Sequence, residues 1–229
     1  MRRVTTTELL DDDLGTPEEI ARSLDDLWRI NRWLGGVRSS LRLLENYFAR
    51  TGAKTARILD VGAGDSRLAT RLQEEFRRRG IEVQFVALDR KLTHLRNGHA
   101  PRPEVPAIAA DVFQLPFGEN AFDVVMCNLF FHHFSGEGAV SLLRALAKIA
   151  RGAVIINDLE RHFLPYMFIC IAYPFAHSRI TRNDGPASVR QAYTRQELQR
   201  FAEIGGFRRF DVERLMPFRL GMTLWKNSA

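Results

Sequence analysis

The feature that most constrains the fold is the run RILDVGAGDSRLA at residues 57–69. Branched and leucine residues end in an acid, two glycines follow with one alanine between them, and apolar residues then return at helical spacing. This order predicts a strand, a tight turn and a helix. Gly62 and Gly64 let the backbone turn sharply with no Cβ in the way, so a ligand can lie against the main-chain N–H groups at the start of the helix.

Further strands and helices alternate along the chain. A helix is expected from about residue 91 and another at about 140–149, and continuous apolar runs predict strands at 83–88, 106–110, 121–127 and 153–157. Continuous rather than alternating apolar strands are typical of a parallel sheet that helices cover on both faces. We therefore expect an α/β fold with a doubly wound sheet and a ligand at the carboxyl ends of its strands.

The end of the chain differs from this pattern. Thr194 and Glu197 have the spacing of a capping box, which predicts the start of a helix that ends near Gly205. Two short strands follow at 207–212 and 218–225 with only a few residues between them. So short a connection forces the two strands to be antiparallel.

The N-terminal part is expected to form a helical cap or lid, residues 1–52, on a main domain of residues 53–229. Residues 1–16 look frayed and polar, and an amphipathic helix should begin at Pro17. Its apolar stripe reaches Asn31, an amide that must find hydrogen-bond partners or cost about 1–3 kcal/mol. Asn31 therefore caps a neighbouring element or reaches a ligand. Two glycines then break the helix before a second one that closes near residue 52.

An aromatic insertion is expected at about residues 160–193. It ends in the sequence NDGPASVRQAY at 183–193, which predicts a loop. The aromatic part is interpreted as a roof over a hydrophobic ligand, as ordinary core or as the contact of a homodimer. Its large side chains include Phe163, Tyr166, Phe168, Tyr173 and Phe175.

Composition and charge exclude several classes. Two cysteines without metal-ligand spacing or a disulfide pattern favour a reducing cytoplasm. The longest apolar segment, 163–176, contains two prolines and is too short for a membrane span. The first 30 residues hold eight acids against four arginines, so of the net charge of +6 the remaining chain carries +10. Because arginines 71, 77, 78 and 79 lie beside glutamates, we interpret this charge as a solvated face rather than a nucleic-acid site.

Taken together, the DVGAG loop, the acid that closes the second strand and the Asp after the third resemble the Rossmann-like S-adenosylmethionine-dependent methyltransferases. That family has a seven-stranded sheet whose last strand is antiparallel, which matches the expected terminal hairpin. The double histidine in CNLFFHHF, residues 127–134, resembles the small-molecule enzymes of ubiquinone and menaquinone biosynthesis. The stretches LWRINRWLGG at 27–36 and DGPASVRQAYT at 184–194 resemble bacterial secondary-metabolite methyltransferases. The resemblance implies methyl transfer to a small aromatic or hydrophobic acceptor, most readily at oxygen, with no metal.

The resemblance also implies which residues bind the cofactor. The acid of the first strand and the glycine loop receive the methionine end, and the acid of the second strand accepts both ribose hydroxyls. The Asp after the third strand and the N–H of the next residue meet the adenine. Two residues after the fourth strand lie beneath the sulfonium. The lid helix adds two more. The predicted cofactor-binding residues are Asp60, Gly62, Ala63, Gly64, Asp89, Arg90, Asp111, Val112, Asn128, Leu129, Asn31 and Arg32. The family often has a third glycine where this chain has Ser66.

Catalytic and substrate residues are less constrained. An imidazole that titrates near neutrality can take the proton of a hydroxyl, so His133 or His132 is a candidate base, unless it packs under the next helix. Asp158 and His162, after the fifth strand, are competing bases, and Asp158 is alternatively a helix cap. The predicted substrate contacts are His132, Arg161, Tyr166, Arg190 and Tyr193.

Three other functions remain open. A nicotinamide-dependent reductase shares the glycine loop, but its fingerprint needs a small residue where this chain has Arg67. Methylation of nucleic-acid bases lacks support, because no Asn/Asp-Pro-Pro-aromatic tetrapeptide occurs after Asn128. A protein or RNA methyltransferase would use the basic body, and a non-catalytic cofactor-binding module would use the acidic first 30 residues to regulate a partner.

Overall fold

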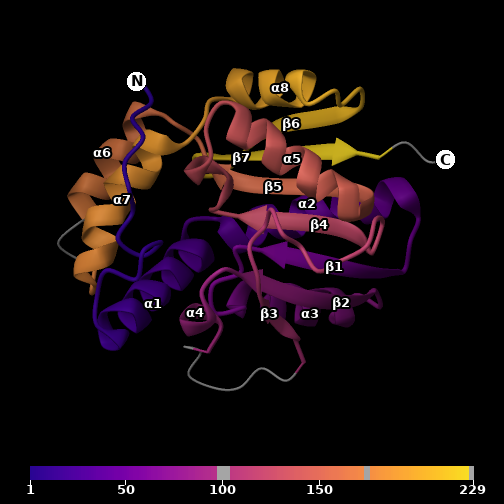
Figure 1. The fold of residues 1–229 in the computed structure, drawn as a ribbon, viewed down its shortest axis with the longest axis horizontal. Helices are drawn as coiled ribbons and strands as arrows, with labels where there is room; N and C mark the ends of the chain where they lie inside the picture. The colour runs from indigo at the N-terminus through magenta and orange to yellow at the C-terminus, as the bar shows by residue number, and fades with distance from the viewer. Residues whose placement is uncertain (97–103, 173–175, 227–229) are drawn as a thin grey trace.

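The computed structural model describes residues 1–96, 104–172 and 176–226, and its centre is one twisted sheet (Figure 1). Within these residues the sheet has seven strands in the order β3-β2-β1-β4-β5-β7-β6. The first five strands are parallel to one another, and β7 lies antiparallel between β5 and β6. The predicted doubly wound sheet with an antiparallel last strand is confirmed. The strands are β1 Thr55–Val61, β2 Glu82–Asp89, β3 Ala107–Ala109, β4 Phe122–Asn128, β5 Ala150–Leu159, β6 Phe210–Leu215 and β7 Arg219–Trp225.

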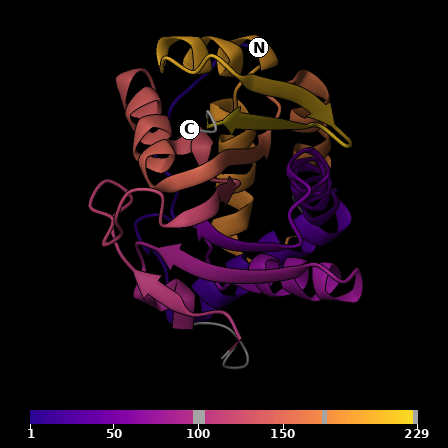
Figure 2. The same ribbon diagram turned by 90° about the vertical axis from the view of Figure 1, so that its right-hand side faces the viewer.

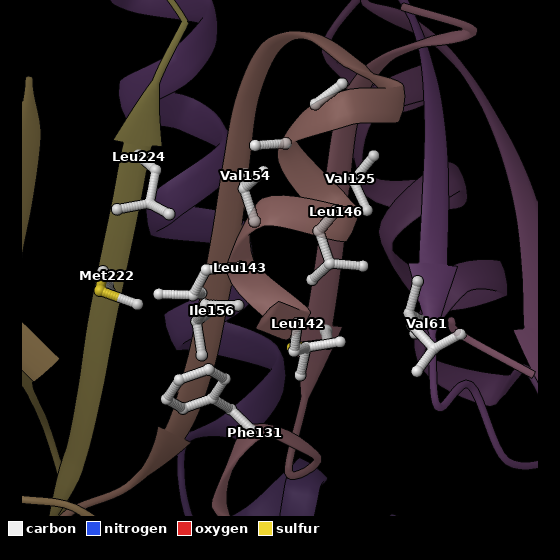
Figure 3. Packing of buried hydrophobic residues seen from close by; sticks show 14 of the residues in the cluster. Val61, Val125, Phe131, Leu142, Leu143, Leu146, Val154, Ile156, Met222 and Leu224 are labelled. Carbon is white, nitrogen blue, oxygen red and sulfur yellow. The ribbon is translucent and has the colours of Figure 1, made fainter. Parts of the chain in front are cut away.

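Helices cover both faces of the sheet (Figure 2). On one face lie α2 (Gly36–Thr51) and α3 (Arg67–Arg78), and on the other lie α5 (Glu137–Ile149) and α8 (Arg195–Ile204). Continuous apolar strands place apolar side chains on both faces of the sheet, so each face needs a helix layer to exclude water. The leucines of α5 pack on β4, β5 and β7 in this way (Figure 3).

The carboxyl ends of the parallel strands face a separate helical group (Figure 1). It contains α1 (Pro17–Trp33), α6 (Phe163–Ala172) and α7 (Arg179–Gln191), with α7 packed against both of the others. Thr16 caps α1 in a capping box with Glu19, and Thr194 caps α8 in the predicted box with Glu197. Two short elements, α4 (Leu92–Arg96) and the 3₁₀ turn η1 (Phe131–His133), also lie near these strand ends.

The expectation that residues 1–16 are frayed is wrong. The Arg3 guanidinium donates to the carbonyl oxygens of Gln191 at 2.7 Å, His132 at 2.8 Å and Phe134 at 3.2 Å, and Glu8 is only 7% exposed. A polar composition hides this, since the Arg3 guanidinium and the Glu8 carboxylate are satisfied by groups far away in the chain.

The predicted loop at 183–193 is also wrong, because most of it belongs to α7. Pro186 lacks the N–H that a helix interior uses, so local propensity argues against a helix here. Tertiary contacts outweigh that cost. Ile180 and Val189 are buried, and the Asp184 carboxylate accepts the backbone N–H groups of Leu9 and Leu10.

Three smaller differences from the expectations concern the bounds of two strands and the aromatic insertion. The strand expected at 207–212 lies at Phe210–Leu215, and β5 extends beyond the predicted 153–157. In the aromatic insertion, α6 is not ordinary core, because Phe163 and Phe168 are largely exposed. Tyr173 and Phe175 lie outside the described residues.

Candidate active site

A cavity of about 640 Å³ opens at the carboxyl ends of β1, β2 and β4, and most of its lining is apolar. Its volume lies in the range of small-molecule sites, and its position is the one predicted for a doubly wound sheet. Two walls of different origin enclose it. The strand-edge wall comprises Asp60, residues 62–64, Asp89 and Asn128, and the N-terminal wall comprises Glu8, Asp11, His132, His133 and Ser188.

The glycine loop is held by the strand beside it. Gly62 and Gly64 have φ angles of +69° and +54°, and a Cβ on Gly62 would meet the Phe130 ring at 2.5 Å. Glycine is required there. The loop N–H groups differ from expectation: those of Gly62 and Ala63 donate to the Leu88 carbonyl, and that of Gly64 donates to the Asp89 carboxylate at 2.9 Å. These three N–H groups are therefore occupied within the chain and fix the shape of the loop.

Asp60 is the most isolated acid of the cavity. It is 1% exposed, and its Oδ2 atom has no hydrogen-bond partner among the described residues. Burial, assisted by the nearby Asp89 carboxylate, raises the pKa of Asp60 to about 7. A buried carboxylate oxygen without a donor is what a cationic ligand group would satisfy.

The remaining predicted cofactor residues lie around the same cavity, with one exception. Asp89 accepts the N–H groups of Gly64 and Lys91, each at 2.9 Å, and burial raises its pKa. Arg90, Asp111, Val112, Leu129 and Asn31 line the cavity as well. Arg32 does not line the cavity: it is exposed and lies over the Trp33 ring, whereas its neighbour Asn31 is buried.

Asn31 finds the partners that its buried position requires. Its Oδ1 atom accepts from Asn128 Nδ2 and from Arg219 Nη2, both at 3.1 Å, and Arg219 Nη1 donates to Asn128 Oδ1 at 3.2 Å. A Cβ on Gly36 would lie 2.1 Å from Asn31 Oδ1, so a glycine must stand there. Arg219 is 1% exposed, and burial lowers its pKa to about 10. Sequence reasoning missed Arg219, because it lies in a strand expected to contribute only core.

The double histidine forms the centre of the N-terminal wall. His132 is 2% exposed, with Nδ1 2.7 Å from Asp158 Oδ1 and Nε2 3.5 Å from Glu8 Oε1. Burial lowers the pKa of His132, but the carboxylates of Asp158 and Glu8 outweigh it and raise the pKa to about 10. The side chain of His133 places Nδ1 2.8 Å from Asp11 Oδ2. Both rings line the cavity.

Asp158 fills neither of the two roles predicted for it, general base and helix cap. Its carboxylate accepts the backbone N–H and the ring nitrogen of His132 and the N–H of Leu159, so it caps no helix. Burial raises the pKa of Asp158, but the His132 imidazolium outweighs that effect and the pKa is lowered. A buried carboxylate engaged in this way does not take a proton from an acceptor; it orients His132.

Five other predicted residues stay outside the cavity. His162 is exposed and accepts the N–H of Leu164, and Arg161 binds Glu197 and the carbonyls of Met1 and Ala192. Tyr193 donates its hydroxyl to the Phe134 carbonyl and packs on Phe131 and Phe201. Tyr166 and Arg190 are half-buried away from the lining. Arg161 and Tyr193 instead tie the insertion to the N-terminus, to α8 and to the end of η1.

Two residues of the N-terminal wall were not predicted at all. Glu8 and Asp11 belong to the acidic run at the chain start, which carries no motif. Apolar residues beside η1 and on α6 also line the cavity, among them Phe130, Phe134 and Phe168. Of these, Phe168 belongs to the aromatic part that was interpreted as a roof over a hydrophobic ligand.

A parallel sheet with a glycine loop after β1, acids at the ends of β1 and β2 and an antiparallel β7 defines the class I fold of S-adenosylmethionine-dependent methyltransferases. Residues 58–152 match the family model described as a methyltransferase domain. The predicted resemblance to this class is therefore confirmed, and the cofactor that the domain implies is S-adenosylmethionine. Asp60 and Asp89 fit such a group, since the first lacks a donor and both face the cavity.

Solved structures and a curated relative agree with this class. The plantazolicin methyltransferase BamL, solved with a triazolic desmethylplantazolicin analogue and S-adenosylhomocysteine, superposes with a TM-score of 0.68 at 15% identity, covering 89% of this chain and 90% of that one. A SAM-dependent methyltransferase from Aquifex aeolicus gives a TM-score of 0.59 at 18% identity over 92% and 98% of the two chains. At these identities the likeness shows the fold.

The curated relative is a demethylmenaquinone methyltransferase from Renibacterium salmoninarum. It is 41% identical over 69 residues, which are 30% of this chain and 27% of the relative. The matched segment thus spans about a quarter of the length of that relative. Separately, no helix in the described part of the chain is long and apolar enough to cross a membrane.

Proposed function

We propose that this protein transfers the methyl group of S-adenosylmethionine to an oxygen atom of a small aromatic or otherwise hydrophobic acceptor. One observation carries the proposal: a single cavity joins the strand-edge wall, which offers acids and a glycine loop, to a lining of Trp28, Phe130, Phe134, Phe168 and Phe218. Acids suit a charged cofactor, and aromatic rings suit an apolar acceptor. The names of similar proteins also specify small-molecule acceptors.

The strand-edge wall is assigned to the cofactor. Asp60 would receive the ammonium of the methionine end, and Asp89 would accept the ribose hydroxyls while its other lone pairs hold Gly64 and Lys91. When bound, the cofactor supplies an electrophilic methyl group on a cationic sulfur. The chain contributes alignment and exclusion of water, which suffice for an in-line displacement once the nucleophile is ready.

Proton removal is assigned to the N-terminal wall. Between the two histidines, His132 is held as an imidazolium by Asp158 and Glu8 and has no capacity to accept a proton. His133 lines the cavity and has one carboxylate partner, Asp11, so it is the proposed proton acceptor. Of the two other acid–base candidates named from the sequence, Asp158 is engaged with His132 and His162 is exposed outside the cavity.

Two further parts of the proposal concern setting and assembly. Free cysteines at 127 and 170 support a reducing cytoplasm, and small-molecule methylation suits secondary metabolism. The outward side of α6 exposes Phe163, Met167 and Ile171, a surface on which a homodimer would form.

The test is an acceptor screen with the purified chain, S-adenosylmethionine and a panel of phenols and hydroxyquinones. Formation of a methyl ether is the expected result. Methylation of RNA or protein but of no small molecule would overturn the proposal, as would binding of cofactor with no transfer to any acceptor.

A further inference from the structure

Three side chains of the N-terminal wall converge in a way that methyl transfer does not require. Glu8, His132 and His133 each offer one potential ligand atom, and these atoms all lie within 4.8 Å of one another. The two imidazole rings are adjacent, with centroids 4.2 Å apart and planes tilted by 33°. Two imidazoles and a carboxylate are a donor set that binds divalent transition metals.

The outer contacts of the two histidines fit this role. His132 Nδ1 is bonded to Asp158, and His133 Nδ1 is bonded to Asp11. A ring that gives one nitrogen to a carboxylate is fixed in orientation, and its other nitrogen becomes a better ligand. The same carboxylate–histidine arrangement occurs twice here, on neighbouring residues.

One ligand atom is buried without a hydrogen bond. His132 Nε2 has no hydrogen-bond partner among the described residues, although its ring is 2% exposed. Its distance of 3.5 Å to Glu8 Oε1 is long for a hydrogen bond. It suits two ligands of one ion, because ligand atoms at about 2.0–2.1 Å from a tetrahedral metal lie roughly 3.4 Å apart.

Glu8 is held in place by hydrogen bonds at the oxygen that lies nearest His132. Its Oε1 atom accepts from Ser188 Oγ at 2.8 Å and from Gln191 Nε2 at 2.9 Å, both on α7. Access also exists from two directions. Glu8, Asp11 and His133 line the main cavity and a second, smaller hollow beside Thr5, Thr6 and Thr7.

We propose that Glu8, His132 and His133 bind one divalent transition-metal ion, such as Zn²⁺ or Mn²⁺, which displaces the Nε2 proton of the His132 imidazolium to solvent and leaves a fourth position open to the cavity. An oxygen of the acceptor is the class of ligand that would occupy this position. That use rests on the proposed methyl transfer, whereas binding of the ion does not. The bound ion would coordinate the acceptor hydroxyl and lower its pKa, so that the hydroxyl releases its proton to solvent. In that case His133 would be a ligand of the ion and would not take up the proton.

The experiment is a metal titration of the full chain without a histidine tag, using Zn²⁺ in competition with a chromophoric chelator. We expect one ion per chain. Glu8→Gln and His133→Gln should each weaken binding at least tenfold, the loss typical of disturbing a metal site. The matched control is His162→Gln, the same substitution at an exposed histidine outside the cavity, which should leave the affinity within twofold. Mg²⁺ should bind far more weakly than Zn²⁺.

Calorimetry with S-adenosylhomocysteine on every variant shows whether the variant is folded and keeps the two proposals separate. If the cofactor product binds but no stoichiometric Zn²⁺ does, the metal site is wrong, and His132 is simply an imidazolium between two carboxylates. Equal Zn²⁺ affinity in all three variants would overturn it too. If Zn²⁺ binds and S-adenosylhomocysteine does not, the metal site stands and the methyl-transfer proposal fails.

Discussion

The two walls of the cavity are built by different kinds of contact. The strand-edge wall comes from the carboxyl ends of β1, β2 and β4 and from the loop after β1, and this loop bonds to the neighbouring strand. The N-terminal wall is assembled from distant segments: Arg3 reaches His132, which is 129 residues away, and Glu8 reaches Gln191, which is 183 residues away. The first wall is therefore fixed by the sheet itself, while the second depends on a terminal segment that must dock.

This difference explains how far sequence reasoning reached. The strand, glycine turn and helix at residues 57–69 carry local patterns, and the short link between the last strands dictates their direction. Both were predicted and are observed. Arg219, Glu8 and Asp11 carry no local pattern, because a buried charge is recognised only by the partners that satisfy it.

The helix α7 teaches the same lesson about propensity. Gly185 and Pro186 argue for a loop, whereas the buried Ile180 and the bonds from Asp184 to the N-terminal segment favour a helix. Those bonds are invisible in the sequence until residues 9 and 10 are known to lie beside α7.

The largest expected effect is on the N-terminal wall. Asp158→Ala removes the partner of a buried imidazolium, and such losses cost about 3–5 kcal/mol. We expect the free energy of unfolding to fall by that amount in denaturant titrations with chelator present. The control is Glu119→Ala, whose carboxylate pairs with Lys148 on the exposed surface and should change stability by less than about 0.5 kcal/mol. A similarly small loss for Asp158→Ala would mean that the wall is not held by this ion pair.

The next effect concerns the strand-edge wall. Asp89→Ala should weaken S-adenosylhomocysteine binding by about 1.5–3 kcal/mol, the worth of hydrogen bonds to a charged group. Calorimetry measures this directly, with Asp12→Ala as the control, since Asp12 is exposed and does not line the cavity. Unchanged affinity in Asp89→Ala would show that the end of β2 does not meet the cofactor.

The pH dependence of cofactor binding tests Asp60. Its pKa of about 7 leaves it largely protonated at pH 6 and ionised at pH 8. A cationic ammonium binds the ionised form, so affinity for S-adenosylhomocysteine should rise roughly tenfold between these values. The direction of this pH dependence follows from the raised pKa of Asp60, because protonation of its carboxylate below that pKa weakens binding of the ammonium. Asp60→Asn should bind more weakly and lose the pH dependence, and a wild-type affinity that falls with pH would contradict the assignment.

The smallest effect separates the two walls most cleanly. Arg3→Met removes four hydrogen bonds of a partly exposed guanidinium and its contact over the Tyr193 ring. We expect a loss of about 1 kcal/mol in stability and faster hydrogen exchange in residues 1–16, with cofactor affinity unchanged. Arg2→Met is the matched control, because Arg2 is exposed. A parallel loss of cofactor affinity in Arg3→Met would show that the walls are not independent.

The central claim is that the cavity binds S-adenosylmethionine. Isothermal titration calorimetry of the full chain with S-adenosylhomocysteine, and in a separate experiment with NADH, tests it most directly. The account predicts saturable binding of one S-adenosylhomocysteine per chain and no heat of binding for NADH. Saturable binding of NADH, with none for S-adenosylhomocysteine, would contradict it.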